Sequence, residues 1–263
     1  MLASRGIASL SLAFFAYDDL PKNLNKLDLE YFEEAVEVLL AHPEVISDRC
    51  GVIAVSKATD VASLMAVHFP KVKALVSISG SPVVYDSTIY YKNKVLLEGI
   101  KMKIENLYID EKGRLSPNFN SVAESVPYID NVLPYYEAPD DTYFYFVAGD
   151  EDAWFCNLGL ELVLESFRKN GFEDDKRIST EIYSGAGHII EPPYNSLVHD
   201  SYMRYLPVEN DEGKHVRSVP IKWGGTLKGT CKAQEDFWPK MISFINHHVR
   251  DTSSHYQNFL EKS

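Results

Sequence analysis

Residues 51–69 read Gly-Val-Ile-Ala-Val-Ser-Lys-Ala-Thr-Asp-Val-Ala-Ser-Leu-Met-Ala-Val-His-Phe. The segment 51–55 is a short apolar run with β-branched side chains, which is typical of a buried strand. After it, apolar residues recur at helical spacing, at Ala62, Met65, Ala66 and Phe69. The stretch therefore predicts a strand, a tight turn and a helix, with Ser56 in the turn.

The same alternation extends in both directions along the chain. Four further apolar runs predict strands, over residues 7–15, 74–78, 143–148 and 180–183. Helical apolar spacing predicts further helices within 29–40, 160–167 and 238–245. Strands that alternate with helices lie parallel and are buried on both faces. We therefore expect an α/β fold with a doubly wound, mostly parallel sheet.

Two stretches lack this alternation, and we expect irregular insertions at about 82–140 and 203–230. A chain of 263 residues can bury one sizeable core. We expect one catalytic domain over residues 1–250, followed by a C-terminal tail at 251–263.

Composition excludes several classes of function. A net charge of −12 disfavours non-specific binding to nucleic acid or to anionic membranes. No apolar stretch reaches transmembrane length, so we expect no stable membrane insertion, and the run at 7–15 fits a buried strand better than a secretory leader. The three cysteines form neither a CxxC pair nor a Cys/His cluster, so we expect no metal site and no bound cofactor.

Ser56 follows a strand and precedes a helix, which is the context of a nucleophile elbow. The usual elbow pattern is Gly-x-Ser-x-Gly, and here residues 54–58 read Ala-Val-Ser-Lys-Ala. The alternative is that Ser56 only caps the helix, because serine is also a preferred N-cap residue.

His188 lies in the glycine-rich segment 184–188, directly after the last predicted strand. A histidine at such a strand end can reach the elbow serine and accept its proton, which makes a weakly nucleophilic hydroxyl reactive.

An acid is expected after the strand that lies between these two residues in the chain. Residues 149–152 there read Gly-Asp-Glu-Asp, and the order serine, acid, histidine is that of α/β-hydrolases. The loop spacing favours Asp152, with Glu151 second and Asp150 third.

Dispersed strings in one order resemble the C-terminal catalytic domain of the acyl-CoA thioesterase and bile acid-CoA:amino acid N-acyltransferase family. The strings are Leu-Ala-Ser-Arg-Gly at 2–6, Tyr-Asp-Asp-Leu-Pro at 17–21, Leu-Glu-Tyr-Phe-Glu-Glu-Ala at 29–35, Ser-Lys at 56–57, Gly-His-Ile-Ile-Glu-Pro-Pro-Tyr at 187–194 and Trp-Gly-Gly at 223–225. The resemblance covers roughly residues 1–250.

The resemblance implies a charge-relay triad that acts on an acyl-CoA substrate, with Ser56 as the nucleophile and His188 as the base. An ungapped match over 142–154 assigns the acid to Glu151, whereas the loop spacing favours Asp152. Family N-acyltransferases characteristically carry cysteine at the nucleophile position, so serine implies a thioesterase that releases fatty acid and CoA. Amino-acid N-acyltransfer and an inactive, acyl-ligand-binding relative remain the alternatives.

The family elbow resembles Gly-x-Ser-Lys-Gly-Gly, and this sequence replaces its glycines with Ala54, Ala58 and Thr59. Complete members also carry an N-terminal β-sandwich domain and the first strands of the sheet with a Gly-rich loop. We therefore expect the sheet here to lack those first strands and that loop. The expected compartment is the cytoplasm, with mitochondria and peroxisomes also open, and the sequence does not give the oligomeric state.

Overall fold

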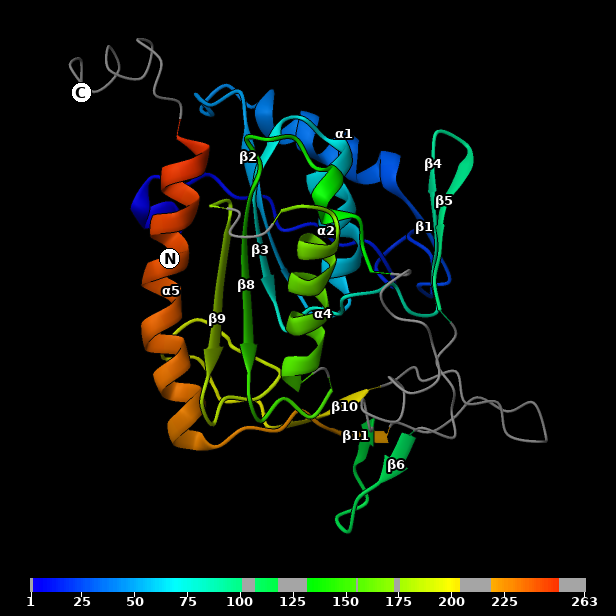
Figure 1. The fold of residues 1–263 in the computed structure, drawn as a ribbon, viewed down its shortest axis with the longest axis vertical. Helices are drawn as coiled ribbons and strands as arrows, with labels where there is room; N and C mark the ends of the chain where they lie inside the picture. Colours follow the sequence, from blue (N-terminus) through cyan, green and yellow to red (C-terminus); the bar gives the residue numbers. More distant parts are fainter. Residues whose placement is uncertain are drawn as a thin grey trace.

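The computed structural model describes residues 2–100, 107–117, 132–154, 156–172, 176–203 and 219–250. Its central sheet has four parallel strands in the order β2-β3-β8-β9, which confirms the predicted doubly wound, mostly parallel arrangement (Figure 1). The strands are β2 (Cys50–Val55), β3 (Val72–Ile78), β8 (Tyr143–Gly149) and β9 (Ile178–Tyr183).

Helices cover both faces of this sheet because successive side chains of a strand point to opposite faces, and here both sets are apolar. On β8, Phe144 and Phe146 belong to one core cluster, whereas Tyr145 and Val147 belong to the other. The first cluster includes side chains of α1 (Leu29–Leu40), α2 (Ala58–His68) and α4 (Cys156–Lys169). The second is closed by α5 (Leu227–Val249), which Figure 1 shows alone on its side.

The strand register brings the carboxyl ends of the strands to one edge. Val55 on β2 pairs with Ile78 on β3, and Ile78 pairs with Val147 on β8. The segments that follow these strands therefore emerge side by side, which is where parallel α/β sheets place their ligands.

Two smaller sheets flank the central one. The first, in the order β1-β4-β5, contains β1 (Lys26–Asp28), β4 (Thr88–Tyr91) and β5 (Lys94–Glu98). The second, in the order β10-β11-β7-β6, contains β6 (Leu107–Ile109), β7 (Leu115–Pro117), β10 (Asp200–Met203) and β11 (Val219–Lys222). Figure 1 shows the second sheet near the carboxyl ends of β8 and β9. Single 3-10 turns occur at Ala3–Arg5 and Tyr135–Glu137.

The predicted strand over 7–15 is wrong, because none of these residues is in a strand. The segment is apolar and lies against the protein, where the Phe14 ring contacts Phe32 at 5.6 Å and Ala13 O accepts a hydrogen bond from Tyr31. Leu10 and Phe15 are 46% and 42% exposed. An apolar run becomes a strand only where a neighbouring backbone offers hydrogen bonds, and this run has side-chain contacts instead.

The expected irregular insertion at 82–140 contains regular structure in its described parts, namely β4 to β7 and the 3-10 turn Tyr135–Glu137. Most of the insertion expected at 203–230, including the charged run at 209–214, lies outside the described residues, as does the tail at 251–263. The extent of the catalytic domain, 1–250, stays a prediction.

Candidate active site

Ser56 occupies a strained turn between β2 and α2. Its φ of 54° lies in the left-handed region, which costs a non-glycine residue about 1–3 kcal/mol. Two backbone hydrogen bonds hold the turn, from Ser56 N to Ile78 O at 2.9 Å and from Thr59 N to Ser56 O at 2.9 Å. Helix α2 has no side-chain cap, and the Ser56 hydroxyl contacts His188 instead, so the helix-cap interpretation is wrong.

The residues that replace the family's glycines fit this turn. Thr59 is fully buried, and its hydroxyl donates to Ser56 O at 2.6 Å. Its side chain lies over Gly80, where a Cβ would come within 2.7 Å of Thr59 Oγ1. The absence of a side chain at Gly80, in the neighbouring loop, thus makes room for the Thr59 side chain, so glycine is not required at position 59.

His188 lies in the loop after β9 and is fully buried. Its Nε2 is 2.7 Å from Ser56 Oγ, within hydrogen-bond distance for proton transfer. The backbone of the loop is fixed where His188 N donates to Trp223 O at 3.0 Å. The Trp223 ring also stacks on the imidazole, with centroids 5.1 Å apart and an interplanar angle of 10°.

Of the three candidate acids, Asp152 faces the imidazole. Its Oδ2 is 2.8 Å from His188 Nδ1, and its Oδ1 accepts from Trp154 N at 2.7 Å. The side chain of Glu151 is exposed. Asp150 Oδ1 accepts from Gly185 N at 2.6 Å and so fixes the start of the His188 loop. A carboxylate on Nδ1 favours the tautomer in which Nε2 can accept a proton from Ser56.

Close backbone packing holds the acid loop and the histidine loop together. A Cβ on Gly187 would overlap Gly224 O, and a Cβ on Gly224 would overlap Glu151 O. Gly224 also forms an isolated bridge with Asp152 and has a φ of 81°. These glycines allow the acid loop, the histidine loop and the segment 223–225 to approach one another at backbone contact distance.

Gly224→Ala should therefore destabilise the protein beyond the cost of its left-handed backbone. Gly171→Ala is the matched control, because Gly171 has a φ of 84° and open space around its Cα. We expect about 1–2 kcal/mol for the control and about 2–4 kcal/mol more for Gly224→Ala. Urea unfolding measures both, and equal losses would contradict the close-packing argument.

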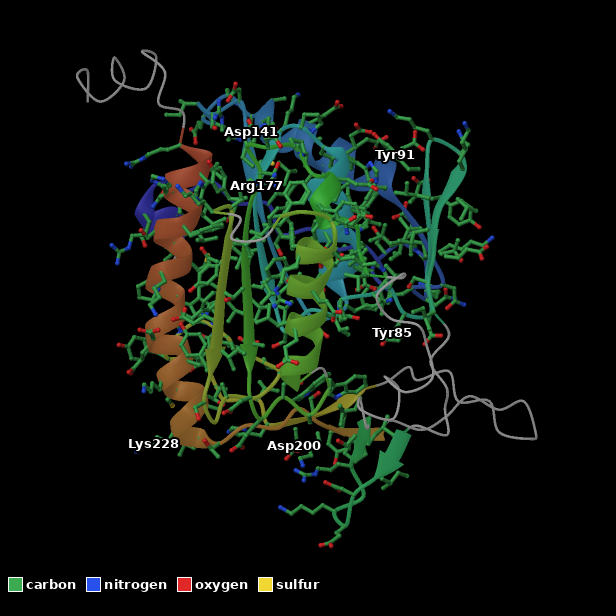
Figure 2. The ribbon with its side chains drawn as sticks, in the orientation of Figure 1. Tyr85, Tyr91, Asp141, Arg177, Asp200 and Lys228 are labelled. Atoms are coloured by element: carbon green, nitrogen blue, oxygen red, sulfur yellow. The ribbon has the colours of Figure 1, made fainter. Side chains whose placement is uncertain are left out.

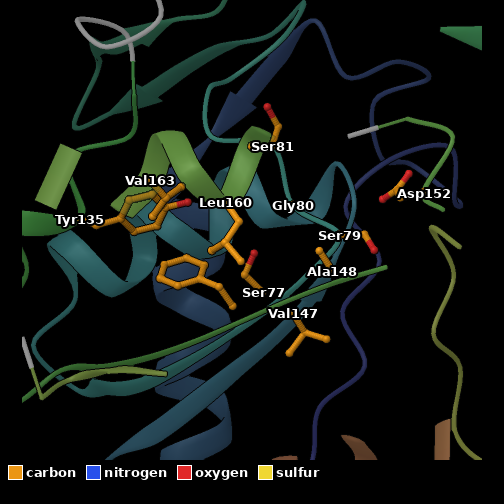
Figure 3. Close-up of a pocket in the computed structure, with 12 residues that line it drawn as sticks. Ser77, Ser79, Gly80, Ser81, Tyr135, Val147, Ala148, Asp152, Leu160 and Val163 are labelled. Atoms are coloured by element: carbon orange, nitrogen blue, oxygen red, sulfur yellow. The ribbon is translucent and has the colours of Figure 1, made fainter. Parts of the chain in front are cut away.

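A small pocket lies next to the acid. Figure 3 shows Ser79 and Asp152 toward one end of it, and Tyr135 with Leu160 and Val163 toward the other. Ser56 and His188 are not among the lining residues, so the pocket adjoins the acid rather than the nucleophile.

Neither a metal site nor a membrane span is found in the part of the chain that the structure describes. Its histidine, cysteine and carboxylate side chains form no group of three or more that could hold a metal ion. None of its helices combines the length and the apolar character that crossing a bilayer requires.

The aromatic neighbours of His188 were not predicted from the sequence. Trp154 lies 5.5 Å from Trp223 between ring centroids, and its Nε1 donates to Lys222 O. The available signal was the Trp-Gly-Gly string at 223–225, which is part of the family resemblance. Its position against His188 depends on contacts between residues far apart in the chain.

Comparison with known proteins identifies the family. The family described as BAAT / acyl-CoA thioester hydrolase C terminal matches residues 27–251. The chain belongs to this family. An acyl-coenzyme A amino acid N-acyltransferase 1 from Mus musculus is 31% identical over 97% of this chain and 56% of its own length. A bile acid-CoA:amino acid N-acyltransferase and an acyl-coenzyme A thioesterase 5, both from Mus musculus, are 32% and 30% identical, each over 95% of this chain and 56% of the relative.

The chain thus spans about half the length of the curated relatives it matches in this family. Among solved structures, a putative alpha/beta hydrolase from Agrobacterium tumefaciens aligns with a TM-score of 0.43 and 14% identity, over 70% of this chain and 62% of that one.

Proposed function

We propose that this chain hydrolyses acyl-CoA thioesters through an acyl-serine intermediate, with Ser56 as the nucleophile, His188 as general acid and base, and Asp152 as the triad acid. The 2.7 Å contact between Ser56 Oγ and His188 Nε2 carries the proposal. Membership of a family that includes acyl-CoA thioesterases supports the substrate class.

In the first half-reaction, Ser56 Oγ attacks the thioester carbonyl carbon while its proton passes to His188 Nε2. The oxyanion that forms needs backbone donors, and the N–H of the residue after the nucleophile, Lys57, is the donor that an elbow supplies. When the carbonyl re-forms, the carbon–sulfur bond breaks and the CoA sulfur takes the proton from His188.

In the second half-reaction, a water molecule gives a proton to His188 and attacks the acyl-serine carbonyl. Collapse of that intermediate releases the fatty acid and returns the proton to Ser56. Throughout, the Asp152 carboxylate accepts the hydrogen bond from His188 Nδ1 and stabilises the imidazolium without taking its proton.

Amino-acid N-acyltransfer is the second candidate, because relatives at 31% and 32% identity are named as N-acyltransferases. The two activities share the first half-reaction and differ in whether water or an amine attacks the acyl-enzyme.

The deciding experiment incubates the purified chain with acyl-CoAs of increasing chain length and follows free thiol, with and without glycine or taurine. We expect CoA release with free acid as the product, and a chain-length profile that defines the acyl preference. Conjugate in place of free acid would favour N-acyltransfer. Folded protein that neither releases CoA nor takes a fluorophosphonate label on Ser56 would exclude both activities.

A further inference from the structure

An ion pair between half-buried Lys57 and buried Asp60 follows the proposed nucleophile in the chain, and the proposed mechanism does not use either side chain. Lys57 Nζ is 2.7 Å from Asp60 Oδ2 and also donates to the backbone oxygen of Tyr85. The Asp60 side chain is 1% exposed and that of Lys57 is 30% exposed. Burial of the Asp60 carboxylate carries a desolvation cost, so the ion pair is weak evidence for stability alone.

Lys57 connects the turn after β2 with the loop between β3 and β4. Lys57 follows Ser56 at the end of β2, whereas Tyr85, labelled in Figure 2, lies in the loop between β3 and β4. That loop begins with Ser79 and Ser81, which line the pocket beside Asp152. The Lys57 ammonium therefore ties the turn that carries the nucleophile to the loop that flanks the acid.

The contact between Lys57 Nζ and Tyr85 O anchors the same residue whose backbone N–H is the proposed donor to the oxyanion. Among the residues that the structure describes, no hydrogen bond uses the Lys57 N–H, which leaves it available to the substrate oxygen. The direction of this N–H depends on how the Ser56–Lys57 peptide is held. Glycines usually allow the tight elbow, and here Ala58 and Thr59 stand in their place.

We propose that Lys57 and Asp60 are a positioning pair, which anchors the elbow to the loop after β3 and keeps the Lys57 N–H directed at the carbonyl oxygen of the substrate. The inference rests on the proposed acyl-serine chemistry and adds a specific role for these two side chains. Their effect passes through the backbone of Lys57, so neither side chain has to touch the substrate.

The charge state of Asp60 gives the pair a characteristic pH dependence. Burial raises the pKa of Asp60 to about 6, and the Lys57 charge opposes that rise. The groups that face it are Lys57, the Tyr85 peptide and the Tyr135 phenol, which burial keeps neutral. The buried apolar side chains of α1, β2 and β3 form one cluster with those of α2, and the Ser77 hydroxyl on β3 is also buried near Thr59 and Gly80.

As the pH falls, protonation of the Asp60 carboxyl should change the reaction rate and the free energy of unfolding in opposite directions. As the pH falls through 6, the carboxyl takes a proton and the ion pair is lost, so we expect the rate to fall. The pKa of Asp60 is higher in the folded state than in the unfolded chain, so the folded state binds this proton more tightly. Protonation of Asp60 therefore stabilises the fold between about pH 4 and pH 6, and unfolding at this group does not explain the loss of rate.

The test compares Lys57→Met, Asp60→Asn and Lys57→Arg by the rate of fluorophosphonate labelling of Ser56 and by kcat and KM for an acyl-CoA. We expect Lys57→Met and Asp60→Asn to lower the labelling rate and kcat roughly 10- to 100-fold with little change in KM, because a misdirected donor affects the transition state. Lys57→Arg, which retains the charge, should restore most of the rate. Lys73→Met is the matched control, because it removes the Lys73–Asp141 ion pair at the far end of the sheet (Figure 2).

The pH profile separates positioning from a purely structural role. In the wild type, the labelling rate should fall by an additional factor of roughly 10 to 100 as the pH drops through 6, because protonation of Asp60 breaks its ion pair with Lys57. This additional fall should be absent in Asp60→Asn, whose side chain is neutral throughout. Wild-type rates and pH profiles in both Lys57→Met and Asp60→Asn would overturn the inference while leaving the proposed function standing. Failure of both variants to fold would overturn it in favour of a structural role, and an unlabelled wild type would overturn the proposed function and the inference together.

Discussion

Ser56→Ala is expected to lower kcat/KM for acyl-CoA hydrolysis by about 10⁴-fold or more, because the proposed acyl-serine intermediate can no longer form. The fold should persist, since alanine replaces serine without a change of backbone and the contacts of the turn come from Ser56 N and Ser56 O. The hydrogen bond between His188 Nε2 and Ser56 Oγ is lost, which we expect to cost about 1–3 kcal/mol of unfolding free energy. Steady-state kinetics and thermal unfolding measure the two effects separately.

Two further variants sharpen this prediction. Ser47→Ala is the control, because the Ser47 hydroxyl bonds Arg49 O and Val249 O near the amino end of β2, away from the site. The double variant Ser56→Ala/His188→Ala should be no slower than Ser56→Ala alone, since the two residues act as a unit. A Ser56→Ala protein that keeps more than a tenth of the wild-type rate would show that another group is the nucleophile.

The sequence predicts the central sheet well because most of its strands are apolar runs between helices. Four of the five predicted strands correspond to β2, β3, β8 and β9. The edge strand β9 is the least apolar of the four, with Ile182 45% exposed. The fifth, 7–15, has the same composition without a hydrogen-bonded neighbour. Composition reports which side chains prefer burial, and it does not report which backbone lies alongside.

The approach of Ser56 to His188 could also be predicted, because parallel strands align their carboxyl ends at one edge. The facing acid was favoured but not decided, because loop spacing favours Asp152 whereas the ungapped family match assigns Glu151. Three consecutive acids follow β8, and the turn decides which of them points inward: Asp150 bonds Gly185 N, Glu151 is exposed, and Asp152 meets the imidazole. That turn depends on Glu151 N bonding to Ala186 O and Gly225 N bonding to Glu151 O, which are contacts between distant segments.

Asp152→Asn should lower kcat/KM by about 10³- to 10⁴-fold with little loss of folding, because an amide in place of the carboxylate selects the wrong imidazole tautomer. Because the Trp154 N–H donates to Oδ1 of residue 152, the asparagine keeps its oxygen there and turns its amide NH2 toward His188 Nδ1. Nδ1 then accepts, which leaves the ring proton on Nε2, facing Ser56 Oγ. An Nε2 that already carries a proton cannot accept the one from serine. Solvent cannot relax this requirement, since the side chains of His188 and Asp152 are 0% and 1% exposed.

Glu151→Gln supplies the matched control for the acid. It neutralises the adjacent carboxylate. Because Glu151 holds the turn through its backbone N and O, we expect the rate to stay within about threefold of wild type, as for most exposed substitutions. The opposite result, a large loss in Glu151→Gln and a small one in Asp152→Asn, would assign the acid to Glu151, as the ungapped family match does. The pair of variants therefore decides between loop spacing and sequence alignment as guides to the acid, because each guide names a different residue of the same turn.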